Sequence, residues 1–557
     1  MIRAVSALIG GGLLLGIAHL AALPPWEGFD ETAHYAYIQY LADVHDLPPR
    51  ATAVLSTDVE AFEGIGPTRY KPQPPFDPFG TYSYRTFFAA PDDVIVQAGT
   101  YLNQPPPEPR RYVPARRANW QSQHPPLYYL LMAPLYLATK GMNWVDHLLL
   151  VRMASYLMAC AALVVGVHGA HLATNRYRLI PDRIAPRARH GGVVLGIALW
   201  PVLFPMWIPE MARLGNDSLS ALIVALVWLR LVHLLGHGDR ARDYAWLGVI
   251  LGCGLLTKVL FAPIAFGVGV FLAARAWRRL SWHRAGTVLM VLAVLVAVTV
   301  GIGGWWYVGN FLDTGSFVGS THFVRLGQAG GVAMVLDTPV TAGRLLEGLA
   351  VIAMTFVWGG TWSFAWPNYA AMVGLALVPL VLAGAYGIGL RRARIDSLTW
   401  LPVFVLVPVA IAIVINLFVK MALYREGFNV PGWYLHLLAV PLGAALGIGI
   451  AACWPARWFR LSLSILGGYA LAFAAWASAS QVLLYTGFAI KAGDRGAFRL
   501  APELPSIGDL VAQVGERLAV IASPNLAAAA FAAGAVLLVV GSGLAWRGYA
   551  TLESDST

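Results

Sequence analysis

Charged residues are scarce in this chain of 557 residues, since aspartate, glutamate, lysine and arginine together make up only 12% of it. A globular protein normally devotes about a quarter of its residues to charge, because charged side chains cover its water-facing surface. Hydrophobic residues reach 58%, and the mean hydropathy is +0.63. This composition excludes an ordinary water-soluble domain and predicts a protein with many membrane spans.

Cysteine is also rare, with three residues in the chain. Cys160, Cys253 and Cys453 fall inside or at the edge of apolar runs. Such positions are typical of cysteine as a small buried residue, and they disfavour a disulfide framework or a cysteine metal site. The sequence has no H-E-x-x-H motif, which disfavours a zinc metalloprotease.

Long apolar runs recur along the chain instead, and most are long enough to cross a bilayer as a helix. We predict an all-α polytopic membrane protein with about 12 spans, in a range of about 11–13. The predicted spans are residues 4–22, 148–172, 191–208, 217–235, 244–257, 259–275, 286–307, 368–389, 399–418, 433–452, 461–482 and 525–546.

Short loops rich in lysine and arginine indicate the orientation, because such loops stay in the cytoplasm. These loops are residues 174–190, 238–243, 275–284, 391–394 and 455–460. With the N-terminus inside and twelve spans, all five fall on the cytoplasmic side, and so does the C-terminus. We therefore predict a protein of the bacterial inner (plasma) membrane with an extracytoplasmic site. The same loops account for the net charge of +10, so the charge does not indicate a nucleic-acid partner.

The topology divides the chain into five regions. Residues 1–22 form the first span, an uncleaved signal anchor, and residues 23–147 form an extracytoplasmic loop with interfacial helices at 30–45 and 124–140. Residues 148–482 form the span bundle, with an outer or re-entrant segment at 308–367. Residues 483–524 are extracytoplasmic, and residues 525–557 form the last span and a cytoplasmic tail.

The stretch FDETAHYAYIQYLADVHDLP (29–48) opens the large loop and brings Asp30, Glu31 and His34 together on one side of a predicted helix. One interpretation makes Asp30 a helix N-cap and Glu31 a first-turn acid. The other makes Asp30 a general base, with Glu31 and His34 positioning an acceptor hydroxyl or holding a divalent metal. This stretch alone does not decide between the two interpretations.

The apolar residues of the same stretch fall on a neighbouring face of the helix. The residues of this stripe are Phe29, Ala33, Ala36, Tyr37, Tyr40 and Val44. An apolar and aromatic stripe next to a membrane span predicts a helix that lies in the membrane interface.

Two further motifs follow in order, HPPL at 124–127 and Arg152 near the start of a span. With the pair Asp30–Glu31, this series resembles the GT-C superfamily of integral-membrane glycosyltransferases, which includes protein O-mannosyltransferases and bacterial aminoarabinose transferases. It is most similar to a bacterial family of multi-spanning proteins within that group. The order and membrane placement of the motifs match up to Arg152, and the similarity is looser from 200 to 450.

The resemblance implies a GT-C-type bundle with a large first extracytoplasmic loop. It also implies an inverting glycosyltransferase that takes a sugar from a polyprenyl-phosphate donor on the outer face. Asp30 is then the base, and Glu31 shapes the donor or acceptor site. His124 and Arg152 are candidates for contacts to the donor phosphate or for structural contacts. His124 stands where relatives often have lysine, which leaves phosphate recognition open. The resemblance assigns neither the acceptor, which is a glycan, lipid or protein, nor a divalent metal.

Other residues at the predicted outer face are candidates for the same site. Lys258, in a stretch similar to the LTK turn of aminoarabinose transferases, either contacts phosphate or snorkels to lipid headgroups. Arg425 is a second candidate for phosphate, while Tyr434 lines a sugar site or acts as an interfacial anchor. Arg213 either enters the site or forms a surface pair with Glu210, three residues earlier.

The residues predicted to bind the acceptor or sugar are His34, Tyr128, Arg213 and Tyr434. Membrane lipids are the remaining expected partner. The alternatives to an enzyme are a transporter or flippase, or a non-catalytic binder of lipid-linked sugars. Transporters typically show internal repeats and charges at the bilayer midplane, whereas acids here collect in one outer loop.

Overall fold

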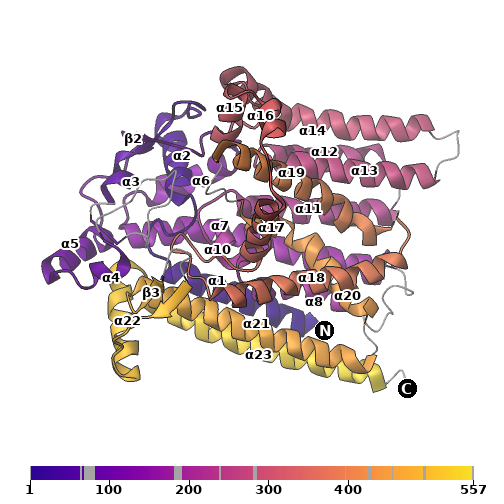
Figure 1. Ribbon diagram of the computed structural model, residues 1–557. Helices are drawn as coiled ribbons and strands as arrows, with labels where there is room; N and C mark the ends of the chain where they lie inside the picture. The colour runs from indigo at the N-terminus through magenta and orange to yellow at the C-terminus, as the bar shows by residue number, and fades with distance from the viewer. Residues whose placement is uncertain are drawn as a thin grey trace.

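The computed structural model describes residues 2–62, 65–67, 82–180, 191–237, 240–279, 285–395, 397–424, 430–453, 456–492 and 497–554. Regular structure in these residues is overwhelmingly helical, and the long helices lie side by side along one direction (Figure 1). Two small antiparallel sheets complete the described part. One pairs β1 (Val54–Ser56) with β2 (Pro114–Ala118), and the other pairs β3 (Ala489–Ala492) with β4 (Ala497–Leu500).

Ten helical segments in the described part are long and apolar enough to cross a membrane. They are Arg3–Ala22, Trp144–Arg176, Asp217–His237, Phe261–Arg278, Val288–Thr314, Tyr369–Arg391, Leu398–Tyr424, Gly432–Ala452, Ser464–Tyr485 and Pro524–Arg547. Each overlaps one predicted span. The prediction of an all-α integral membrane protein is therefore confirmed.

Two of the predicted spans are not single helices long enough to cross a membrane. The segment predicted at 191–208 is divided into α8 (Gly191–Ala198), α9 (Trp200–Leu203) and α10 (Trp207–Ala212). Pro201 and Pro205 lie within it, and proline both removes a helix hydrogen bond and clashes with the preceding turn. The segment predicted at 244–257 is α12 (Ala241–Leu255), whose 15 residues extend only about 22 Å, less than a bilayer core of about 30 Å.

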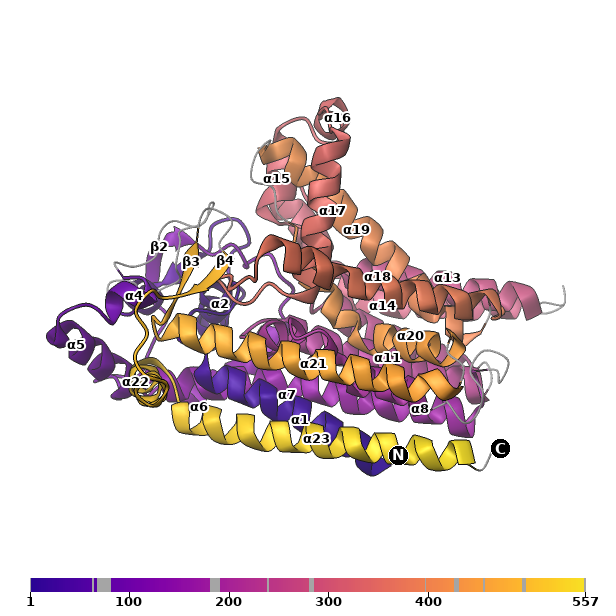
Figure 2. The ribbon, with the colours of Figure 1, turned by 60° about the horizontal axis from the view of Figure 1, so that its bottom comes forward.

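Helices distant in sequence pack closely through small residues. Helix α1 (Ile2–Ala22) runs along α23 (Pro524–Ser554) in both views (Figures 1 and 2). A methyl group added at Gly11 of α1 would lie 2.7 Å from the Leu538 side chain. A methyl group added at Gly196 of α8 would lie 2.2 Å from the carbonyl oxygen of Gly443 in α20 (Ala439–Cys453). Close approach through glycine is typical of helices packed in membranes.

The remaining spans pack on one another in pairs. They are built from α7 (Trp144–His171) and the π-helix η1 (Leu172–Arg176), α11 (Asp217–His237), α13 (Phe261–Arg279), α14 (Ala285–Thr314), α18 (Tyr369–Arg391), the 3₁₀-helix η4 (Leu398–Trp400) and α19 (Leu401–Tyr424), the 3₁₀-helix η5 (Gly432–Leu438) that precedes α20, and α21 (Ala456–Tyr485). Helix α7 packs on α11, α12 on α14, α18 on α20 and α13 on α19.

Shorter elements gather at one end of the bundle and form what we call the outer layer (Figures 1 and 2). Its helices are α2 (Glu31–Val44), α3 (Thr57–Phe62), α4 (Tyr84–Phe87), α5 (Asp92–Asn103), α6 (Leu127–Thr139), α15 (Thr321–Gln328), α16 (Val332–Asp337) and α22 (Ile507–Ile521). Helix α17 (Ala342–Val357) runs steeply across the long helices in Figure 2. The outer layer thus holds most of the motifs found in the sequence.

Helices α2 and α6 occupy the predicted interfacial segments 30–45 and 124–140, but the stripe on α2 does not face the membrane. Ala33, Ala36 and Tyr37 are fully buried in the protein. Ala33 and Ala36 pack with Leu55 of β1, while the ring of Tyr37 stacks on that of Tyr129 in α6 at a centroid distance of 3.7 Å. The expected membrane contact is therefore wrong for these three residues, because they are buried inside the outer layer, whereas Val44 at the end of the stripe is exposed.

Candidate functional site

Asp30 lies in a strained turn directly before α2. Its φ of 59° and ψ of 11° are left-handed, and its side chain makes no capping bond to the helix. Instead its Oδ1 accepts a hydrogen bond of 2.8 Å from Trp120 Nε1. Trp26, four residues earlier, is also left-handed at φ 63°. Such conformations cost about 1–3 kcal/mol each and gather at functional sites, so the segment 26–30 is held in place by its surroundings.

Glu27 supplies part of that support, and the sequence analysis did not identify it. Its buried carboxylate accepts hydrogen bonds from Tyr84 Oη at 2.7 Å, Thr361 Oγ1 at 2.8 Å and the Ser363 amide at 2.6 Å. These partners come from α4 and from the loop after α17. Burial raises the pKa of Glu27, although the three hydrogen bonds oppose the rise. Glu27 therefore ties the turn to two distant segments.

Glu31 and Arg152, predicted separately, form a buried ion pair. Arg152 donates from Nε to Glu31 Oε1 at 2.8 Å and from Nη2 to Glu31 Oε2 at 2.6 Å. Glu31 also accepts from the amides of Leu214 at 3.0 Å and Gly28 at 3.1 Å. Both side chains are 2% exposed or less. This two-point geometry is the strongest form of such a pair, and it joins α2 to α7.

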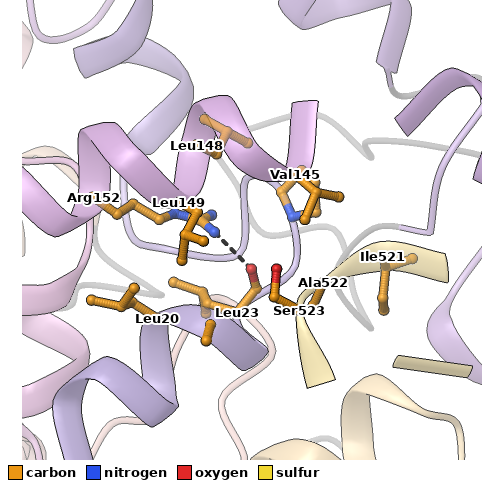
Figure 3. Close-up of a pocket in the computed structure, with 11 residues that line it drawn as sticks. Leu20, Leu23, Val145, Leu148, Leu149, Arg152, Ile521, Ala522 and Ser523 are labelled. Carbon is orange, nitrogen blue, oxygen red and sulfur yellow. Dashed lines mark hydrogen bonds between the residues drawn. The ribbon is translucent and has the colours of Figure 1, made fainter. Parts of the chain in front are cut away.

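Arg152 also bonds to the backbone directly after α1, between that helix and the strained turn. It donates to the carbonyl oxygens of Leu23 at 2.6 Å and Pro24 at 2.8 Å, so each guanidinium nitrogen bonds to the protein. Figure 3 shows Arg152 directed at the Leu23 carbonyl, beside a small hollow. Its other lining residues are Leu20, Ala21, Pro25, Val145, Leu148, Leu149, Ile521, Ala522 and Ser523. Among the described residues, Arg152 is thus the one predicted site residue that borders this hollow.

Arg213 is at the centre of a second buried charge cluster. It donates to Glu210 at 2.8 and 3.1 Å and to Asp217 at 2.8 Å. The pairing with Glu210 was predicted, but as a surface contact of small worth, whereas both side chains are 3% exposed or less. Arg213 also donates to the carbonyl of Phe29 at 2.8 Å. The cluster therefore contacts the backbone beside Asp30.

Lys258 joins the same cluster. Its ammonium bonds the second oxygen of Asp217, and it lies 5.0 Å from the centroid of the Tyr434 ring, within cation–π range. Lys258 is 6% exposed, so it faces the interior of the protein rather than headgroups. The structure thus brings Lys258, Arg213 and Tyr434 together.

His34 and His124 lie side by side between α2 and α6. Their rings are 6.0 Å apart and tilted by 22°, and His34 Nδ1 is 2.9 Å from the Tyr129 hydroxyl. Burial lowers the pKa of His34 well below its ordinary value, and burial together with Lys258 lowers the pKa of His124 to about 3. Both rings are neutral at pH 7. His124 can thus offer a hydrogen bond to phosphate but no positive charge.

Tyr128, next along α6, bonds within the protein. Its hydroxyl accepts from the Gly215 amide at 3.0 Å and pairs with Ser155. Burial raises the pKa of Tyr128 above its ordinary range. Tyr128 therefore supports the loop between α10 and α11.

Three cations act on Asp30. Burial raises the pKa of Asp30, and the charges of Arg213, Lys258 and Lys420 oppose this rise. Lys420, on α19, was missed in the sequence, because one lysine within an apolar run carries no motif. Arg425, predicted nearby, lies outside the described residues.

Aromatic rings form a wall beside Asp30. Phe29 stacks on Trp433 at a centroid distance of 4.3 Å and contacts Trp362 at 5.3 Å and Phe364 at 5.4 Å. Trp362 and Tyr434 remain partly exposed at its edge. Flat apolar faces next to a carboxylate suit a sugar ring, which has both apolar faces and hydroxyl edges.

The metal interpretation of Asp30, Glu31 and His34 does not fit the arrangement. Among the described residues, no group of three or more histidine, cysteine, aspartate or glutamate side chains is placed to hold a metal ion. Both oxygens of Glu31 are bonded to protein donors, and His34 bonds Tyr129. Glu31 and His34 are thus engaged within the protein and are not arranged to hold a metal ion.

No protein-family model matches the chain, and no curated protein sequence matches it either. Among solved structures, the chain is similar to a crystal structure of ArnT from Cupriavidus metallidurans in the apo state, with 15% identity and a TM-score of 0.39, over 92% of this chain and 75% of that one. It is also similar to ArnT from the same organism bound to undecaprenyl phosphate, with 13% identity and a TM-score of 0.37, over 91% and 76% of the two chains.

Proposed function

We propose that this protein is an inverting glycosyltransferase that moves a sugar from a polyprenyl-phosphate donor to an acceptor on the extracytoplasmic face of the membrane. One observation carries the proposal: Asp30 stands in a strained turn at the end of a membrane bundle, within the field of three cations. The series Asp30–Glu31, HPPL and Arg152, which resembles GT-C enzymes, supports the same class. The basic loops support an extracytoplasmic site, with both termini in the cytoplasm.

In the proposed reaction, Asp30 is the general base. Its carboxylate takes the proton of an acceptor hydroxyl, and the acceptor oxygen attacks the anomeric carbon from the side opposite the phosphate. A new glycosidic bond forms while the sugar–phosphate bond breaks, and the bonding electrons leave with the prenyl phosphate. Burial raises the pKa of Asp30, and a base whose pKa is nearer to neutral accepts a proton more effectively at pH 7.

The departing phosphate gains negative charge and needs cations that are already in place. Arg213 and Lys258 are held by Glu210 and Asp217, so they contribute a fixed field. We assign the direct phosphate contacts to the neutral His124 and to Lys420, because the charge of Lys420 acts on Asp30. Arg425 remains a predicted further contact.

Glu31 and Arg152 have a different role in this proposal. Their hydrogen bonds are all used within the protein, so they position Asp30 and do not contact either substrate. Tyr434 and the aromatic wall border the sugar, while His34 and Tyr129 border the acceptor. The donor is borne by a lipid and the acceptor arrives from outside, so the base stands where both meet.

The test uses the purified full chain in lipid nanodiscs with a panel of radiolabelled polyprenyl-phosphate sugars and pools of glycan, lipid and peptide acceptors. We expect one donor to lose its label, and Asp30→Asn to lower that rate by a factor of about 10²–10⁴, the usual contribution of a general base. Asp58→Asn is the matched control. Asp58 is an outer-layer carboxylate bonded to Gln39 and Ser56, and its removal should change the rate little.

Equal rates in the wild type and Asp30→Asn, with a folded variant, would refute the base. Binding of a labelled donor without transfer to any acceptor pool would instead favour a carrier-binding protein. Movement of the intact donor across a sealed bilayer would favour a flippase.

A further inference from the structure

Helix α22 carries an apolar stripe of which only one end is buried against the rest of the protein. Ile507, Val511, Val514, Leu518 and Ile521 recur at spacings of three and four and therefore share one face of the helix. At the C-terminal end, Leu518 and Ile521 are 4% and 1% exposed. At the N-terminal end, Ile507 and Val511 are 83% and 68% exposed. The stripe thus begins outside the protein and ends in its core.

The buried end shows which way the stripe faces. Ile521 lines the same hollow as Leu20 at the end of α1 and Leu148 near the start of α7, so the stripe is turned toward the ends of the membrane spans (Figure 3). Helix α22 runs across the direction of α21 and α23 in Figure 1 and is seen end-on beside them in Figure 2. Helix α23 begins at Pro524, three residues after α22 ends. The exposed half of the stripe therefore lies at the level where the spans leave the membrane.

The polar residues of α22 are turned away from the stripe. Asp509 and Glu516 lie on the opposite arc and are exposed. Arg517 is the one basic residue of the helix sequence, and it is turned to the protein, where it donates to the Thr486 carbonyl at 2.8 Å and lies 4.2 Å from the Phe488 ring centroid. The exposed half of α22 thus offers apolar side chains and no positive charge.

We propose that α22 is a membrane-surface helix whose partner is the apolar part of the adjacent lipid leaflet, into which Ile507 and Val511 insert. An amphipathic helix lies in the membrane interface when its apolar face is buried there and its polar face stays in water. The absence of an outward cation in α22 makes this contact independent of anionic headgroups. Because Asn103 of α5 donates to the Val520 carbonyl at 2.9 Å, α22 also sets the height of α5 above the membrane.

Site-directed spin labelling of the full chain in nanodiscs tests this contact without any enzymatic assay. The three native cysteines are replaced by alanine, and single labels are introduced by Ile507→Cys and Val511→Cys, with Asp509→Cys and Glu516→Cys as matched controls on the same helix. Collision with oxygen, which concentrates in lipid, is compared with collision with a water-soluble nickel complex. We expect an oxygen-to-nickel ratio several-fold higher at 507 and 511 than at 509 and 516.

The same ratios are expected in phosphatidylcholine alone and in phosphatidylcholine with phosphatidylglycerol. A ratio that favours water at 507 and 511 would overturn the proposal, and so would shielding from both reagents, which would indicate a protein partner or a second copy. A strong rise with phosphatidylglycerol would overturn the independence from headgroup charge. If either labelled variant fails to fold, Val514→Cys supplies a third position on the same face, with the same expected ratio.

Discussion

Removal of Arg152 alone should destabilise the protein more than removal of the whole ion pair. Arg152→Met leaves the buried Glu31 carboxylate without its cation, and breaking a buried pair in this way costs about 3–5 kcal/mol. It also removes the donors to the carbonyls of Leu23 and Pro24, which adds to the cost. In the double variant, Glu31→Gln removes the stranded charge, while its amide oxygen can still accept from Gly28 or Leu214. We therefore expect the two substitutions to be coupled by about 2–3 kcal/mol.

Equilibrium unfolding by sodium dodecyl sulfate in mixed micelles, followed by circular dichroism, measures these free energies. Glu60→Gln is the matched control, because it breaks the Arg117–Glu60 pair, which is 3.6 Å long and has side chains 26% and 23% exposed. Pairs of that kind contribute about 0–1 kcal/mol. If Arg152→Met costs no more than the control, or if the double variant is as unstable as the sum of the single variants, the assigned anchoring role is refuted.

Three other predictions follow from the site. Trp120→Phe removes the hydrogen bond that favours the charged form of Asp30, so the pKa of Asp30 should rise further. The rise of the transfer rate with pH should then move to higher pH. An unchanged pH–rate profile would contradict this. Burial raises the pKa of Glu27 in the folded protein above its value in the unfolded chain. Glu27 therefore contributes to stability at pH values below its pKa in the unfolded chain, and this contribution is lost as the pH rises through its pKa in the folded protein. Glu27→Gln should flatten that loss, as measured by melting temperature against pH, and an equally steep loss would argue against it. Lys420→Met should weaken polyprenyl-phosphate binding in nanodiscs about tenfold, as expected for a lost charged hydrogen bond, and unchanged affinity would exclude Lys420 from the donor site.

The positions of the spans could be predicted because hydropathy over about 20 residues reflects the thickness of the bilayer. The segment predicted at 525–546 matches the observed Pro524–Arg547 for this reason. The segment at 191–208 is as apolar as a span, but the effect of Pro201 and Pro205 depends on whether neighbouring helices satisfy the freed backbone groups. Composition therefore predicted an apolar segment there but not its division into α8, α9 and α10.

The site was predictable only where residues form a motif. Asp30, Glu31 and Arg152 were found through a known series, but the series did not show that Glu31 and Arg152 bond each other across 121 residues. Glu27 and Lys420 are single charged residues in apolar surroundings, and nothing in the adjacent sequence distinguishes a buried anchor from a surface charge. Their partners come from α4, the loop after α17 and the turn before α2, so only the folded chain reveals them.

The packing of α1 along α23 has a consequence for the order of assembly. About 500 residues separate the two helices, and at synthesis rates of about 5–20 residues per second α1 waits about 25–100 s for this partner. Asp30 follows directly from α1, so the turn that carries it is attached to a helix that lacks its neighbour for most of translation. Donor lipid that arrives during this interval meets an incomplete site, and the base reaches its final place only after α23 has inserted.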